Sequence, residues 1–168
     1  MQYKLIAFNA RYIHSCLALF YVRDELQRNL PECQSQIVQY TINDPYYPTL
    51  QSIAAGDPQG FLFSVYIWNS FYVKRLIKDL VKTAPGIPVI LGGPQALALA
   101  DDLIPEVRCN CTVIQGEIEG VNHTFYEHLI QGGLLPLYGC EKKSPFKSPY
   151  RQSDFADTLQ NRHIYYES

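Results

Sequence analysis

Residues that could hold a ligand or move a proton gather in four short stretches of this sequence. The stretches are Asn9-Ala10-Arg11-Tyr12-Ile13-His14-Ser15, Ser64-Val65-Tyr66-Ile67-Trp68-Asn69, Gly92-Gly93-Pro94 and Gly116-Glu117-Ile118-Glu119-Gly120. An imidazole can act as a ligand or a base, and two nearby carboxylates can bind a metal or exchange protons. Adjacent glycines let a bulky ligand approach the backbone closely. All four stretches are therefore candidate parts of a ligand site.

Each stretch also has an interpretation without a ligand. Paired glycines after a strand often serve turn geometry alone. Trp68 and Asn69 could pack against and cap the start of a helix. Glu117 and Glu119 have no His or Asp at ligand spacing, which favours solvated or capping carboxylates. The sequence alone does not choose among a ligand, a base and a surface residue for His14.

The elements that must carry these stretches alternate between short apolar runs and amphipathic segments. Strands are expected at residues 3–8, 36–42, 61–65, 87–91 and 112–115. Helices are expected at residues 16–29 with Ser15 as the cap, from residue 70 to the Pro85-Gly86 pair, and at 95–104 and 121–131, with a loop or short helix at 46–57. Right-handed crossovers leave few arrangements for such units. We expect an α/β fold over residues 1–134, a flavodoxin-like, Rossmann-like, doubly wound five-stranded parallel sheet in the order 2-1-3-4-5.

Ligands of such sheets bind beyond the carboxyl ends of the strands, near the switch in strand order. All four stretches follow expected strands. The sequence has no G-x-G-x-x-G after the first strand and no G-x-x-x-x-G-K-S/T, so the usual dinucleotide and triphosphate fingerprints are missing. A flavodoxin-type phosphate loop is missing as well.

Composition narrows the partners and the compartment. The formal net charge is -2 and the pI about 6.1, with no basic run, so no nucleic-acid partner is expected. The longest apolar run, residues 60–68, is far shorter than the roughly 20 residues of a membrane span. No secretion signal is recognisable, and the five cysteines, including Cys109 and Cys111, contain no CxxC pair. We expect a cytoplasmic protein with reduced thiols and no membrane partner.

The last stretch, residues 135–168, differs from the rest. It is rich in proline, glycine and polar residues, which is typical of a tail or linker. Its end, His163-Ile164-Tyr165-Tyr166-Glu167-Ser168, is strand-like, so it is either a frayed end or a strand that continues into something else.

In this order and on this scaffold, the four stretches resemble the cobalamin-binding domain at the N-terminus of B12-dependent radical SAM proteins. That family includes methyltransferases and anaerobic magnesium-protoporphyrin monomethyl ester oxidative cyclases, and the resemblance covers about residues 3–131. It implies that cobalamin (B12) is the cofactor. The residues implied to surround the corrin and its nucleotide tail are Asn9, Arg11, Tyr12, His14, Ser15, Ser64, Tyr66, Trp68, Asn69, Gly92, Gly93, Pro94, Gly116 and Glu117.

The resemblance also assigns roles within this set. Ser64 matches the serine that hydrogen-bonds the buried dimethylbenzimidazole tail, and Gly92-Gly93 leave space for that tail. Trp68 and Asn69 would lie at the corrin face or rim.

One departure from the wider B12 motif, D-x-H-x-x-G, bears on the cobalt ligand. It aligns with Asn9-x-Arg11-x-x-His14, so an arginine replaces the ligating histidine. Protonated arginine has no lone pair to donate. The resemblance then implies base-off cobalamin without histidine ligation through this motif, with coordination by His14 as a variant.

The family's second half is a radical SAM barrel that begins with C-x-x-x-C-x-x-C. That motif, which holds a [4Fe-4S] cluster beside S-adenosylmethionine, is absent from this chain. We therefore expect a module that binds the corrinoid and pairs with the radical SAM barrel of a parent chain, with residues 135–168 as the linker and no radical chemistry of its own. Two alternatives stay open: a degenerate domain that keeps the fold only to dock, and a flavin- or nucleotide-binding flavodoxin-like protein.

Overall fold

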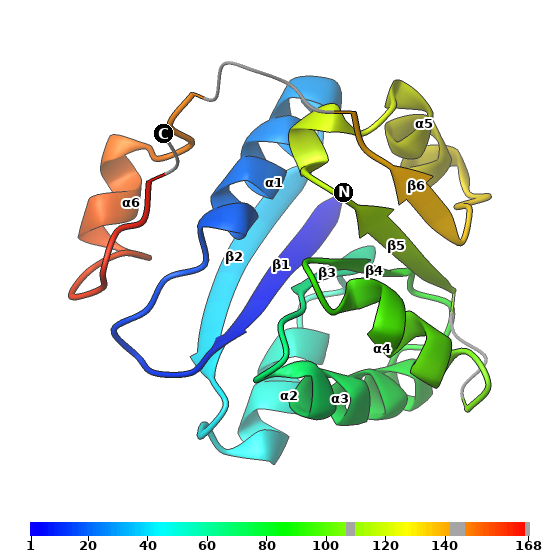
Figure 1. Ribbon diagram of the computed structural model, residues 1–168, viewed down its shortest axis with the longest axis horizontal. Coiled ribbons are helices and arrows are strands. Elements are labelled where there is room, and N and C mark those ends of the chain that lie inside the picture. The colour runs from blue at the N-terminus through cyan, green and yellow to red at the C-terminus, as the bar shows by residue number, and fades with distance from the viewer. Residues whose placement is uncertain (107–109, 142–146, 167–168) are drawn as a thin grey trace.

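A computed structural model describes residues 1–106, 110–141 and 147–166 of the chain (Figure 1). Cys109 therefore lies outside the described residues, as do Lys142, Lys143, Glu167 and Ser168. The described residues form one six-stranded parallel sheet in the order β2-β1-β3-β4-β5-β6. The strands are β1 (Gln2–Asn9), β2 (Gln34–Thr41), β3 (Gly60–Ser64), β4 (Val89–Gly92), β5 (Cys111–Gln115) and β6 (Leu137–Gly139).

Helices cover both faces of this sheet, because the central strands are apolar on both sides. The helices are α1 (Leu17–Asn29), α2 (Tyr46–Ala54), α3 (Ser70–Thr83), α4 (Ala96–Leu103), α5 (His123–Gln131) and α6 (Gln152–Ala156), with a 3-10 turn η1 (Ile118–Gly120). On β1, Leu5 and Ala7 pack in the core beneath α1 and α5, whereas Ile6 and Phe8 face α2, α3 and α4. The two helical layers lie on opposite sides of the sheet in Figure 1.

The expected fold class is confirmed, and so is the order of the first five strands. The expected count of five strands is wrong, because β6 adds a sixth at the free edge of β5. This strand has only three residues and is therefore too short to show an alternating pattern. It follows Pro136 and ends at Gly139. Pairing with β5 and burial of Tyr138 against Phe125 hold it in place instead.

The start of α1 also differs from the expectation. The helix begins at Leu17 after Cys16, and no side chain caps it. The hydroxyl of Ser15 donates to the carbonyl of His163 at 2.6 Å. Ser15 is therefore not a helix cap, because a segment far along the chain takes its hydroxyl.

The stretch after residue 135 folds back onto the sheet and onto α1. Besides β6, it contains α6, whose Asp154 forms an ion pair with Arg23 of α1 at 2.5 Å. The two side chains are only 6% and 10% exposed. The strand-like run at 163–166 does not form a strand.

Within the residues that the structure describes, no helix combines the length and apolar character needed to cross a membrane.

We expect the stability of the fold to fall at alkaline pH, in part through Tyr3. Burial, followed by the charge of Cys33, raises the pKa of Tyr3 to about 12. In the unfolded chain the phenol ionises near 10, so the stabilisation is complete below pH 10 and is lost between about pH 10 and 12. Between pH 9 and pH 11.5, the free energy of unfolding of Tyr3→Phe should therefore fall by about 2 kcal/mol less than that of the wild-type chain. Urea unfolding at pH 9 and pH 11.5 measures it.

The matched control is Tyr47→Phe, because Tyr47 is exposed on α2. Burial also raises the pKa of Tyr150 to about 12, so part of the pH dependence should survive in Tyr3→Phe. If the free energy of unfolding fell by the same amount between pH 9 and pH 11.5 in both variants, the role of Tyr3 would be contradicted.

Candidate functional site

The four chemistry-bearing stretches meet at one edge of the sheet. They follow β1, β3, β4 and β5, and all strands of the sheet are parallel, so their carboxyl ends lie together (Figure 1). The chain switches direction between β1 and β3, the position where such sheets bind ligands. Two hollows open at this edge, one beneath α1 and one above the end of β1.

The first hollow, here called the slot, is a cavity of about 150 Å³ between α1 and the strands. Its walls are mainly apolar. Its lining residues are Ala18, Leu19, Tyr21, Val22, Leu62, Phe63, Ser64, Ile90, Gly92, Gly93, Ile114, Gly116, Glu117, Ile118 and Glu119. The apolar walls suit a planar aromatic ring, and Ser64 adds a hydroxyl at the end of β3.

The two adjacent glycines have different roles in the slot. A Cβ on Gly92 would meet no atom within 4 Å, so this position leaves open space. Gly93 has a φ of +101°, and a Cβ there would lie 2.6 Å from the carbonyl oxygen of Val65. Gly93 is thus required by the turn, whereas Gly92 keeps the slot open.

The second hollow, here called the rim cavity, has a volume of about 580 Å³. It is lined by Asn9, Ala10, His14, Ser15, Cys16, Leu17, Tyr66, Trp68, Tyr165 and Tyr166. The rings of Tyr66 and Trp68 stack at 4.5 Å with an interplanar angle of 9°. A flat aromatic surface therefore forms part of its wall.

A buried hydrogen bond links a residue of one hollow to a residue of the other. The thiol of Cys16, which lines the rim cavity, donates to the hydroxyl of Ser64, which lines the slot, at 3.3 Å. Burial raises the pKa of the Cys16 thiol, so it stays protonated and can donate. A ligand that reaches from the rim cavity into the slot would pass this pair.

Asn69 lies beneath the rim rather than on it. The side chain is 1% exposed, and its amide donates to the carbonyls of Phe8 at 3.0 Å and Ser64 at 3.1 Å. Its oxygen accepts from the backbone N–H of Tyr66 at 2.9 Å. These bonds join the ends of β1 and β3 to the turn that carries Tyr66 and Trp68. Because the Asn69 side chain makes them, it does not cap the N-terminus of α3.

We expect Asn69→Ala to destabilise the fold by about 2 kcal/mol, because three backbone groups lose their partner. Chemical denaturation followed by circular dichroism measures the change. Asn122→Ala is the matched control, since Asn122 caps α5 from an exposed position and should cost about 1 kcal/mol. A loss for Asn69→Ala no larger than the control's would contradict a stabilising role for all three of its hydrogen bonds.

The other predicted site residues are spread more widely. Arg11, Tyr12 and Pro94 are exposed and line neither the slot nor the rim cavity. Gly116 has a φ of +111° and turns the chain beside Cys140, and Glu117 is exposed at the slot. Asn9 is buried and donates to the carbonyl of His14 at 2.9 Å.

Sequence reasoning missed three kinds of residue at this site. Cys16 and Leu19 resemble ordinary core residues in the sequence. Gln39 of β2 accepts hydrogen bonds from Asn9 at 3.2 Å and from the Cys16 backbone N–H at 2.7 Å, thereby joining β1 to the start of α1. Tyr165 and Tyr166 come from the stretch expected to be a linker, and no local signal links them to residues 9–17.

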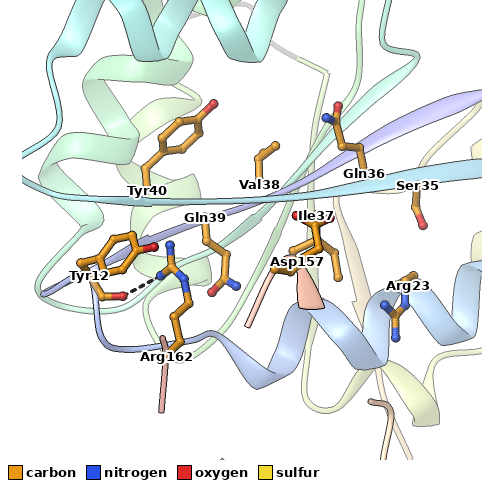
Figure 2. A pocket seen from close by; sticks show the side chains of 11 residues that line it. Tyr12, Arg23, Ser35, Gln36, Ile37, Val38, Gln39, Tyr40, Asp157 and Arg162 are labelled. Atoms are coloured by element: carbon orange, nitrogen blue, oxygen red, sulfur yellow. Dashed lines mark hydrogen bonds between the residues drawn. The ribbon is translucent and has the colours of Figure 1, made fainter. Parts of the chain in front are cut away.

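A further cleft of about 520 Å³ runs along the open edge of β2 (Figure 2). It lies away from the strand switch, and both of its arginines are already hydrogen-bonded. Arg23 is held by Asp154 and by the carbonyl of Pro149, and Arg162 donates to the carbonyl of Tyr12 at 2.8 Å. The slot and rim cavity are the better candidate site.

Fold and site together define a doubly wound α/β protein, flavodoxin-like or Rossmann-like, with a composite hollow at the strand switch. No protein-family model matches the chain, and no curated protein matches it. Among the described residues, no group of three or more His, Cys, Asp or Glu side chains is placed to hold a metal ion.

Proposed function

We propose that this chain is a cobalamin-binding module, with the corrin in the rim cavity and the dimethylbenzimidazole tail in the slot. The observation that carries the proposal is that an apolar slot and an aromatic-walled cavity both open at the strand switch, with the Cys16–Ser64 contact between them. The sequence resemblance of the four stretches supports the same ligand. A flat cofactor with a pendant aromatic ring would need two neighbouring hollows, one wide and one narrow and apolar.

The residues of the slot fit such a tail. Leu62, Ile90 and Ile114 offer apolar contact, and Ser64 places a hydroxyl beside them for one ring nitrogen. Gly92 leaves the space that the ring would fill. Burial of the ring between α1 and the sheet would provide most of the affinity, since buried apolar area scales with stabilisation.

We also propose that the cofactor binds base-off and that no protein nitrogen from the B12 motif position ligates the cobalt. Arg11 stands at that position, has no lone pair, and is exposed outside both hollows. Cobalamin supplies the cobalt-centred group-transfer or radical chemistry, while the chain supplies binding and orientation. By resemblance alone, we further propose a radical SAM partner domain carrying a [4Fe-4S] cluster and S-adenosylmethionine.

Mixing the purified chain with hydroxocobalamin and then desalting it tests the proposal. We expect about one equivalent of corrinoid absorbance to stay with the protein, and none of the absorbance of flavin mononucleotide in a parallel sample. Electron paramagnetic resonance of the reduced complex should show no nitrogen splitting. Retention of flavin without corrinoid, or of neither, overturns the proposed cofactor.

A further inference from the structure

The C-terminal segment, defined here as residues 162–166, runs along the loop that joins β1 to α1. Arg162 donates from Nη1 to the carbonyls of Tyr12 at 2.8 Å and His14 at 2.9 Å. Its guanidinium also lies 4.4 Å from the centre of the Tyr12 ring. Figure 2 shows these two side chains together at the end of the cleft beside β2. The segment is therefore fastened to the loop at its first residue.

The next residue continues this pairing with the loop. The backbone N–H of His163 donates to the carbonyl of Ile13 at 2.6 Å. The carbonyl of His163 accepts from the hydroxyl of Ser15. Bonds to both the N–H and the carbonyl of His163 fix the two peptide units that flank this residue, so the direction of the following residues is set.

That direction carries two tyrosines to the rim cavity. Tyr165 and Tyr166 line it, and the hydroxyl of Tyr165 lies 2.5 Å from Nδ1 of His14. The carbonyl of Tyr165 accepts from the hydroxyl of Tyr150 at 2.9 Å, and the ring of Tyr150 contacts that of Tyr166 edge-on. The aromatic end of the segment is thus held from two sides.

The chain that leads to the segment is anchored as well. Arg23 of α1 donates to Asp154 and to the carbonyl of Pro149, and both charged side chains are about nine-tenths buried. Separating a buried ion pair of this kind is costly. The segment is consequently part of the folded site.

We infer that Tyr165 and Tyr166 are cofactor-binding residues that form a second aromatic wall of the corrin site, beside the Tyr66–Trp68 stack. This inference rests on the proposed function. Tyrosine rings offer rigid apolar surface with little entropy to lose on binding. Contact with the corrin would bury both rings, which are 40% and 70% exposed in this structure.

Substitution of each tyrosine tests the inference. We expect Tyr165→Ala and Tyr166→Ala each to raise the Kd for hydroxocobalamin about tenfold. Tyr47→Ala, at an exposed tyrosine that does not line the rim cavity, should leave the Kd unchanged. Trp68 is the only tryptophan, so quenching of its fluorescence by the bound corrinoid gives the titration curve. Unfolding midpoints close to wild type exclude misfolding as the cause.

Hydrogen exchange at the amide of His163 provides a second readout. Exchange should slow when hydroxocobalamin binds, because the segment would then contact the corrin on one side and the loop between β1 and α1 on the other. Faster exchange, or a Kd that is unchanged or lower in both alanine variants, would overturn the inference and show that the segment plugs or merely borders the site. Failure of the wild-type chain to bind at all would instead overturn the proposed function and this inference with it.

Discussion

Gly92→Leu should abolish cobalamin binding while leaving the fold intact, with the Kd for hydroxocobalamin raised about 100-fold or more. Gly92 lines the slot, and its Cβ position opens onto empty space. A leucine side chain would fill that space and exclude the dimethylbenzimidazole. Its burial against apolar neighbours should stabilise the protein slightly, since filled apolar volume is favourable. Desalting and titration measure binding, and thermal unfolding measures stability.

A corrinoid without the nucleotide tail makes this prediction specific. Cobinamide lacks the dimethylbenzimidazole, so Gly92→Leu should bind it as well as the wild-type chain does. Gly139→Leu is the matched control, because a Cβ on Gly139 also meets nothing within 4 Å but lies on β6 outside the slot. Wild-type affinity for cobalamin in Gly92→Leu would show that the tail does not enter the slot.

Gly120→Ala should destabilise the fold by more than about 3 kcal/mol, the upper end of the cost of overpacking. A Cβ on Gly120 would lie 1.7 Å from the carbonyl oxygen of Glu141 and 2.9 Å from its nitrogen. The contact is with the main chain, so substitution of Glu141 cannot relieve it. The turn η1 and the chain after β6 must move apart, although the backbone N–H of Glu141 donates to the Gly120 carbonyl at 3.0 Å.

This movement would also reach the slot, because Ile118 and Glu119 of the same turn line it. Urea unfolding followed by circular dichroism measures the loss of stability. Gly139→Ala serves as the control and should change the free energy of unfolding by less than about 0.5 kcal/mol. Equal unfolding curves for the two alanine variants would contradict this account of η1 packing.

The α/β class and the order of the first five strands could be predicted from the sequence, because the signals for them are local. Val73, Leu76 and Leu80 repeat at helical spacing and are all buried in α3. The residues at 61–63 form a continuous apolar run and are buried on both faces of the sheet. Such patterns depend on neighbours a few residues away, and right-handed crossovers then restrict the topology.

The glycine pair shows how far local information extends into the site. Its position after the expected strand at 87–91 predicted either a turn or room for a ligand. In the structure Gly93 forms the turn and Gly92 leaves the open space, because Gly93 has a φ of +101° and a Cβ on it would meet the Val65 backbone, whereas a Cβ on Gly92 would meet nothing within 4 Å. The cobalamin assignment itself stays a prediction from resemblance.

Tertiary structure alone decided the remaining features, because each depends on contacts between distant parts of the chain. β6 forms because it can pair with the free edge of β5. Its three residues are too few to show a pattern that predicts a strand. Asn69 is a clamp because Phe8, far back in the sequence, places its carbonyl beside it. Ser15 bonds His163, 148 residues away, so the stretch expected to be a linker supplies part of the site. Patterns of residue type determined the scaffold and the edge of the sheet where a ligand would bind. Long-range tertiary contacts determined which side chains meet there.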